Sequence, residues 1–264
     1  MAAAGATKYV PGQVHDLSRI ETAEVSYSSE GASIGSYLAR PREAGSYPGL
    51  IVIHEAWAVN DHIKDLTRRF ANLGFIAMAP NLFTRVGDPS KAEMPEIQRL
   101  MQAMPDALVV RDLENAADYL RKQPGINGKI GCVGFCMGGR CTLLFACSSD
   151  KVDAAVDCWG GGITRANNDA VTTPNRPKPI IDMVANLHCP LYAVFGAEDQ
   201  NPSPEHMAQL QAKLEQTGKA SIATLESFAN AGHAFLADYR PNYRETAAFS
   251  LWPKMVFFLK RHLS

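Results

Sequence analysis

Apolar segments of strand length alternate with segments of helical periodicity through most of this chain of 264 residues, and that alternation limits the folds it can adopt. Residues 49–54 form a continuous apolar run bounded by ProGly, which is typical of a strand covered on both faces. Residues 61–73 have a helical periodicity that stops at Gly74, and residues 75–79 are again typical of a strand. The alternation predicts an α/β fold with a mostly parallel sheet and helices on both faces.

The rest of the chain supplies further units of the same kind. We expect a long amphipathic helix over 105–123, because Val109, Leu113, Ala116 and Leu120 form one apolar stripe. Other expected strands are 129–135, 154–158, 191–195 and 222–228, and other expected helices are 203–217 and a last segment that reaches residue 263. Pro253 lies inside that last segment and should kink or restart the helix. A long loop rich in Pro and Asn is expected over 166–186.

Two β-rich runs, 22–27 and 32–39, precede the alternating region and are joined by the turn-prone sequence SerSerGluGly. They predict an antiparallel hairpin at one edge of the sheet. Residues 1–17 are expected to be a flexible arm, so that residues 18–264 form a single domain. A chain of this length commonly forms one α/β domain.

Composition and charge argue against several classes of protein. Lys plus Arg (26) nearly balance Asp plus Glu (27), and a net charge of −1 gives no overall field that attracts nucleic acid or anionic lipid. No apolar run reaches the roughly 18 residues of a membrane helix, and the N-terminus lacks the pattern of a secretory signal. Four of the six cysteines lie within residues 132–147, with no CxxC or HExxH pattern in the chain. We therefore expect a cytoplasmic protein with reduced thiols, no metal site and no cofactor.

The strongest local motif is GlyPheCysMetGlyGly at residues 134–139, between an apolar strand and a helix. It matches the nucleophile elbow, G-x-nucleophile-x-G, with Cys136 in place of the usual serine. The sharp turn requires small flanking residues, here Gly134 and Gly138, and lifts the side chain of residue 136 clear of the sheet. The N–H of Met137 and the first turn of the helix would then face an oxyanion. We predict Cys136 as a nucleophile, and the alternative is an ordinary buried cysteine in a glycine-rich turn.

A cysteine nucleophile needs a base, and the base needs a group that orients it. In proteins with this elbow the chain order is nucleophile, acid, histidine. Asp199 follows the expected strand 191–195, at the sheet edge where α/β folds build their sites, and His233 lies in a glycine-containing loop after the strand 222–228. The order of these residues along the chain and their positions after strands predict a triad of Cys136, Asp199 and His233. Glu198 competes with Asp199 for the same role.

Five motifs along the chain resemble the dienelactone hydrolase family of the α/β-hydrolase superfamily. From residue 49 to the C-terminus they are IleValIleHisGluAlaTrpAlaValAsn (51–60), AlaProAsnLeuPheThrArg (79–85), GlyPheCysMetGlyGly (134–139), PheGlyAlaGluAsp (195–199) and AlaGlyHisAlaPhe (231–235). The resemblance implies an α/β-hydrolase fold and an enzyme that opens small enol-lactones or esters through an acyl-thioester. Its partner would be a small-molecule lactone or ester, and it would act as a monomer or homodimer.

The resemblance also implies roles for residues outside the triad. Glu55 matches a family glutamate that lies beside the resting thiol and regulates its ionisation, since a nearby carboxylate disfavours a thiolate. The N–H of Ala56 would be the second oxyanion donor, beside that of Met137. Arg85 matches an arginine that holds the carboxylate of a lactone acid. The family's second substrate arginine is expected at position 237, where this chain has alanine, and Arg240 is a candidate to replace it.

Other interpretations stay open from the sequence. The same scaffold could serve a general carboxylesterase or a thioesterase, which a panel of substrates would distinguish. A non-catalytic binding protein is a second alternative, and the intact set of Cys136, Asp199, His233 and Glu55 argues against it. A redox-sensing thiol is a third. The sequence does not decide whether the loop over 160–186 acts as a lid.

Overall fold

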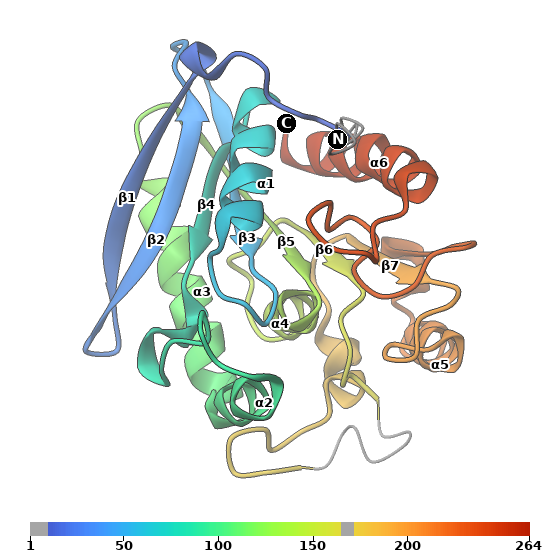
Figure 1. The fold of residues 1–264 in the computed structure, drawn as a ribbon. Helices are drawn as coiled ribbons and strands as arrows, with labels where there is room; N and C mark the ends of the chain where they lie inside the picture. Colours follow the sequence, from blue (N-terminus) through green and yellow to red (C-terminus); the bar gives the residue numbers. More distant parts are fainter. Residues whose placement is uncertain (1–9, 165–171) are drawn as a thin grey trace, which may run out of the picture.

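The computed structural model describes residues 10–164 and 172–264, and in this part of the chain the central element is an eight-stranded sheet in the order β1-β2-β4-β3-β5-β6-β7-β8 (Figure 1). β1 (Ile20–Ser29) and β2 (Ala32–Pro41) form an antiparallel hairpin at one edge, and β2 is antiparallel to β4 (Ile76–Pro80). The remaining strands are parallel to β4: β3 (Tyr47–Ile53), β5 (Ile126–Phe135), β6 (Ala154–Cys158), β7 (Leu191–Gly196) and β8 (Ala223–Phe228). The predicted α/β fold with an edge hairpin is confirmed.

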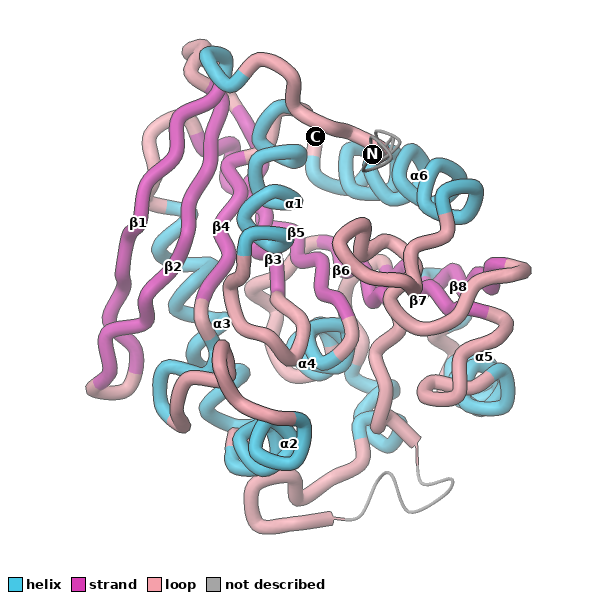
Figure 2. Tube along the Cα trace, in the orientation of Figure 1, coloured by secondary structure: helices cyan, strands magenta, loops and turns pink. Residues whose placement is uncertain are grey.

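Helices cover both faces of this sheet, because successive strand residues point in opposite directions (Figure 2). Along β3, Leu50 and Val52 belong to one core cluster, together with residues of α1 (Asp61–Asn72) and α6 (Glu245–Leu263). Ile51 and Ile53 belong to the other cluster, with residues of three further helices: α3 (Asp106–Arg121), α4 (Met137–Ala146) and α5 (Pro204–Gln216). The unbroken apolar run of this segment is therefore explained by burial on both faces.

Two helices that follow strands begin at side chains that accept backbone hydrogen bonds. Oδ1 of Asn60 accepts from the N–H of Ile63 at 3.1 Å, which caps the start of α1. At α5, Oγ of Ser203 accepts from the N–H of His206, and Nδ1 of His206 accepts from the N–H of Ser203. These caps fix where the chain turns back from the carboxyl edge of the sheet.

The structure differs from the sequence predictions in two helices. No expected element covers α2 (Met94–Ala103), which buries only Ile97 and Leu100 and so has a weak apolar periodicity. α6 does not restart at Pro253 but runs through it as one helix. Proline removes the hydrogen bond to the carbonyl of Phe249, four residues earlier. Phe249 is 43% exposed, so that turn lies at the surface, where water can replace the missing donor.

Segments expected to be irregular are partly ordered. In the loop over 166–186, Thr173 pairs with Arg176 and a 3₁₀ helix forms over Ile180–Asn186, while residues 165–171 lie outside the described residues. In the expected N-terminal arm, the carbonyl of Pro11 accepts a hydrogen bond from Nη1 of Arg69 at 3.3 Å. Residues 1–9 of that arm also lie outside the described residues. None of the described helices combines the length and apolar character needed to cross a bilayer.

Candidate active site

Cys136 lies at the sharp turn between β5 and α4, where its backbone has φ 57° and ψ −118°. Residues other than glycine rarely adopt a positive φ, and such strain is concentrated at functional sites. A Cβ at Gly134 would lie 2.0 Å from the carbonyl oxygen of Gly138, and a Cβ at Gly138 would lie 2.3 Å from the carbonyl oxygen of Ile53. Neither position accepts a side chain, which explains the two glycines of the motif.

The exposure of Cys136 distinguishes it from the other cysteines. All six thiols lie in the described part of the chain and are free, and Cys136 is the one that is not buried. It packs against both core clusters, at the junction between the two faces of the sheet. Burial raises the pKa of each of the others: Cys132, Cys141, Cys147, Cys158 and Cys189. Among the six, Cys136 is thus the thiol that a substrate can reach.

His233 connects Cys136 with Asp199. Nδ1 of His233 lies 2.9 Å from Oδ2 of Asp199, which is 3% exposed and also accepts a hydrogen bond from the N–H of Asn201. Burial lowers the pKa of His233, but hydrogen bonds to Asp199 and Cys136 and the negative charges of both outweigh burial and raise it to about 10. The side chain of Glu198 is exposed instead. The three residues of the predicted triad are therefore close together, with the imidazole in the middle.

The loop after β3 carries Glu55 and Ala56 and lies against the elbow. A Cβ at Gly138 would be 2.6 Å from the carbonyl oxygen of His54, so the start of α4 touches the residue before Glu55. Glu55 is 2% exposed, and its Oε2 accepts a hydrogen bond from the hydroxyl of Tyr239 at 3.2 Å. Tyr239, which the sequence analysis did not single out, thus brings the loop after His233 to the predicted regulatory carboxylate.

His54 fixes the position of this loop. Its Nδ1 lies 2.6 Å from the carbonyl oxygen of Glu55, and its Nε2 accepts a hydrogen bond from the N–H of Leu82 at 3.1 Å. Burial lowers the pKa of His54 to about 4, against a smaller opposing effect of the bond to Glu55. The ring is therefore neutral at physiological pH, with Nδ1 as the donor. It joins the loop after β3 to the segment after β4.

The two predicted substrate arginines have partners within the protein. Nε and Nη2 of Arg85 lie 3.1 and 2.8 Å from the two carboxylate oxygens of the buried Asp112, and Nη2 lies 2.6 Å from the carbonyl oxygen of Ser29. The guanidinium of Arg240 lies over the ring of Trp57 at 5.6 Å. Arg85 is bound within the protein, so its position gives no support to a role in substrate binding.

A cavity of about 460 Å³ opens at the elbow, and its wall contains Cys136, Met137 and His233. Two arginines that the sequence analysis did not single out, Arg140 and Arg176, also line it. Arg140 directly follows the elbow motif and lies about one helical turn after Cys136, and this spacing is the signal that could have indicated it. Arg176 comes from an irregular loop, where no periodicity indicates which side chains face the site.

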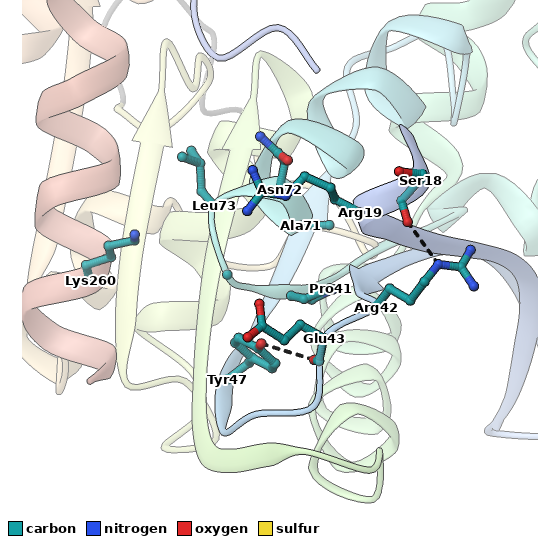
Figure 3. Close-up of a pocket in the computed structure, with 11 residues that line it drawn as sticks. Ser18, Arg19, Pro41, Arg42, Glu43, Tyr47, Ala71, Asn72, Leu73 and Lys260 are labelled. Carbon is teal, nitrogen blue, oxygen red and sulfur yellow. Dashed lines mark hydrogen bonds between the residues drawn. The ribbon is translucent and has the colours of Figure 1, made fainter. Parts of the chain in front are cut away.

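A second cavity, of about 610 Å³, lies at the opposite end of the parallel strands (Figure 3). It borders Tyr47, the first residue of β3, and Gly74, just before β4. Arg42 in its wall donates to the carbonyl of Ser18 at 3.0 Å. Open α/β sheets bind ligands at the carboxyl ends of their strands, and no nucleophilic thiol lines this cavity. The cavity at Cys136 is therefore the candidate active site.

In the described residues, no three His, Cys, Asp or Glu side chains are grouped to hold a metal ion.

Comparison with known proteins agrees with this geometry. The sequence model of the Dienelactone hydrolase family matches residues 34–263. The chain belongs to the dienelactone hydrolase family. It is 34% identical over 259 residues to the "Putative carboxymethylenebutenolidase" of Salmonella typhimurium, covering 96% of this chain and 93% of the relative. It is also 34% identical over 241 residues to the protein of the same name from Escherichia coli K12, covering 90% and 86%.

A solved structure supports the same assignment. A "Putative Dienelactone Hydrolase" from Klebsiella pneumoniae superposes with a TM-score of 0.85 at 32% identity, covering 92% of this chain and 99% of the other. This dienelactone hydrolase family member is a hydrolase with the α/β-hydrolase fold, as the sequence motifs predicted.

Proposed function

We propose that this hydrolase opens small lactones or esters through a triad of Cys136, His233 and Asp199 and an acyl-thioester intermediate. The observation that carries the proposal is the placement of His233: its Nδ1 lies 2.9 Å from Oδ2 of the buried Asp199, it lines the same cavity as Cys136, and Cys136 and Asp199 both raise its pKa. The thiol belongs to a strained elbow and opens onto a cavity, so an activated nucleophile and room for a substrate coincide.

In the first step, His233, whose pKa is raised to about 10, holds the proton that Cys136 has given up, and the thiolate of Cys136 attacks the carbonyl carbon. The S–C bond forms as the carbonyl π electrons move to oxygen. The N–H groups of Ala56 and Met137 would stabilise this oxyanion, and Met137 is the first residue of α4, where backbone N–H groups lack helical partners. Collapse then breaks the bond to the leaving oxygen, which takes the proton from His233.

The second step releases the acid. In the acyl-thioester the sulfur of Cys136 carries no negative charge, so one cause of the raised pKa of His233 is removed. The neutral imidazole accepts a proton from water while the water oxygen attacks the thioester carbon. The C–S bond breaks, the acid leaves, and the pair of Cys136 and His233 is restored. Asp199 keeps the imidazole oriented throughout.

Glu55 is proposed to regulate the thiol. Its buried carboxylate lies on the loop that touches α4, and the hydroxyl of Tyr239 gives it a partner other than the sulfur. A carboxylate held by Tyr239 leaves the thiolate free to attack, whereas one that turned toward Cys136 would raise the pKa of the thiol by like-charge repulsion.

The test compares ring opening of a carboxylated dienelactone and cleavage of a 4-nitrophenyl ester by the native protein, by Cys136→Ala and by Cys189→Ala. Cys189 is a buried thiol that does not line the cavity and serves as the matched control. We expect Cys136→Ala to lose turnover and Cys189→Ala to keep it. Mass spectrometry of the protein quenched during turnover should find the acyl group on the peptide that contains Cys136.

The possible outcomes distinguish the proposal from its alternatives. Fast lactone opening that Cys136→Ala abolishes supports the proposal as stated. Cleavage of the simple ester alone through Cys136 keeps the triad and replaces the lactone by a general ester. Normal turnover by Cys136→Ala contradicts the proposed nucleophile.

A further inference from the structure

A groove of about 550 Å³ lies between α3, the end of α4 and the segment that leads into the 3₁₀ helix over Ile180–Asn186. Its apolar lining comes from three separate parts of the chain: Ala107, Val110, Leu144, Pro177 and Met183. Leu144 belongs to a core cluster, and Val110 and Met183 pack against the same cluster. The core is therefore open to solvent at this point, and a concave apolar surface of this kind is typical of a ligand site.

The other charged groups in the wall of the groove have partners. Asp106 accepts from the two terminal nitrogens of the buried Arg140 at 2.8 and 3.0 Å. Arg111 lies 2.7 Å from Oε2 of Glu114, and its second partner, Glu30, is exposed and does not line the groove. The wall therefore presents charges that are already paired, together with apolar side chains, along its length.

Lys178 supplies an unpaired positive charge at the groove. It lines the groove, its side chain is exposed, and among the described residues it has no ion-pair partner. Pro177 and Pro179 flank it, and Pro179 has φ −61° and ψ 138°. Because proline fixes its own φ and keeps the residue before it extended, the backbone that carries Lys178 is rigid. An anion at the groove would find this charge already in place.

The length of the groove indicates the shape of its ligand. The lining residues of α3 run from Asp106 to Glu114, which at a rise of about 1.5 Å per residue is about 12 Å. A peptide laid along this length would bring N–H and C=O groups that need partners, and the paired charges of the wall offer few. An alkyl chain has no polar group along its length, so it fits the lining without that loss.

We propose that this groove binds a free medium-chain fatty acid anion, with its alkyl chain along the apolar lining and its carboxylate at Lys178. The site is separate from the proposed ester hydrolysis, because no residue lines both the groove and the cavity at Cys136. The two hollows are nevertheless neighbours, since Asp106 lines the groove and its partner Arg140 lines the cavity. The test must therefore distinguish between them.

The experiment measures binding by isothermal titration calorimetry with three probes below their micelle concentrations. Decanoate combines the alkyl chain with one negative charge, butyrate has the same charge on a much shorter chain, and decyltrimethylammonium has the long chain with a positive charge. We expect decanoate to bind at one site, about 30-fold or more tightly than butyrate, because the additional methylene groups leave water. We expect decyltrimethylammonium to bind at least about threefold less tightly than decanoate.

Substitutions in the lining make the result specific. Val110→Glu places a carboxylate among the apolar side chains of the half-buried floor and should weaken decanoate binding by about tenfold or more. Ala107→Glu at the exposed rim replaces this variant if it does not fold. Lys178→Gln should weaken binding by about threefold, as for one exposed ion pair. Lys122→Gln is the matched control, because Lys122 is an exposed lysine at the end of α3 that does not line the groove.

Alkylation of Cys136 with iodoacetamide separates the groove from the cavity at the elbow. The alkylated protein should bind decanoate as the native protein does. If alkylation abolishes binding while Val110→Glu and Ala107→Glu retain it, decanoate occupies the cavity at Cys136 and the groove site is overturned. Absence of saturable decanoate binding also overturns it, as does equal affinity for decanoate and decyltrimethylammonium. Selective loss in the groove variants, with Lys122→Gln unchanged, supports the site whether or not the protein cleaves esters.

Discussion

Nδ1 of His233 lies 2.9 Å from Oδ2 of Asp199, although 34 residues separate them in the chain. β7 and β8 are neighbouring parallel strands, and each residue follows one of them at the carboxyl edge of the sheet. The hydrogen bond therefore joins two loops that the sheet has already placed side by side. The same hydrogen bond is one of the causes that raise the pKa of His233.

Replacement of Asp199 should shift the alkaline limb of the pH profile of kcat/KM. A histidine whose pKa is raised to about 10 keeps its proton until the pH approaches that value, so kcat/KM of the native protein should fall only there. In Asp199→Asn, one of the causes that raise the pKa of His233 is lost. The limb should then move to lower pH by at least about one unit, with kcat/KM reduced by about 10³-fold or more.

The control for this change is Glu198→Gln, which alters the exposed neighbouring carboxylate. It should leave the alkaline limb where it is. The measurement is kcat/KM for a 4-nitrophenyl ester from pH 6 to about pH 10.5, with substrate hydrolysis by buffer subtracted. A shifted limb in Glu198→Gln together with an unshifted one in Asp199→Asn would assign the acid to Glu198.

Substitution of Gly134, at the start of the elbow, should destabilise the protein far more than substitution of an exposed glycine in a strand. In Gly134→Ala the new Cβ would lie 2.0 Å from a backbone oxygen, so β5 and α4 must separate. We expect the free energy of unfolding to fall by about 3 kcal/mol or more. Gly35→Ala, with nothing within 4 Å of its Cβ, should change it by less than about 1 kcal/mol. Urea unfolding followed by circular dichroism measures both, and equal losses would contradict the crowding argument.

Arg85 should contribute to stability rather than to substrate selection. Arg85→Gln leaves the carboxylate of Asp112 buried without its partner, so the free energy of unfolding should fall by about 3 kcal/mol. Arg111→Gln removes an exposed arginine that pairs with Glu30 and Glu114, and the expected loss is about 1 kcal/mol or less. Urea unfolding gives the comparison. Full stability of Arg85→Gln, combined with weaker binding of anionic esters only, would restore Arg85 as a substrate ligand.

The buried Asp157 in β6 should make the protein less stable as the pH rises. Burial raises the pKa of its carboxyl to about 7, against the opposing effect of the hydrogen bond from Gly160. Between the ordinary value of 3.8 and about 7, the folded state keeps a proton that the unfolded state has lost. Stability therefore decreases with pH across this window, by up to about 1.4 kcal/mol per pH unit.

Asp157→Asn removes this titration while keeping an oxygen that can accept from Gly160. The variant should gain stability relative to the native protein as the pH increases from 5 to about 8. Urea midpoints at both pH values test this, because every other titrating group is common to the two proteins. If the stabilities of the native protein and of Asp157→Asn changed with pH in the same way, Asp157 would not be protonated in the folded state.

Much of the fold could be predicted because its signals are local. The apolar run that became β3 is buried on both faces, and the helix after it begins at the Asn60 cap. The elbow was recognisable for the same reason, since Gly134 and Gly138 are required by contacts within one strand-turn-helix unit and its neighbour. α2 was missed because only two of its residues are buried, which leaves too little periodicity to detect.

Some sequence predictions remain predictions. The division into an arm and a single domain, the cytoplasmic location and the state as monomer or homodimer follow from composition and resemblance. The roles of Glu55, Ala56 and Met137 belong to the proposed mechanism and are tested with it.

The order of the elements, the family and the candidates for the triad could all be inferred from the sequence, because they depend on short-range patterns and on motifs that keep their order along the chain. Which arginines line the cavity at the thiol depends instead on how the elements pack together. Arg85 was a candidate by motif, but the fold pairs it with Asp112 on α3. Arg176 had no motif, yet the end of α2 holds it in the cavity wall. A guanidinium on a long side chain takes the partner that the packed elements bring near it, and that choice is made across the fold, not along the chain.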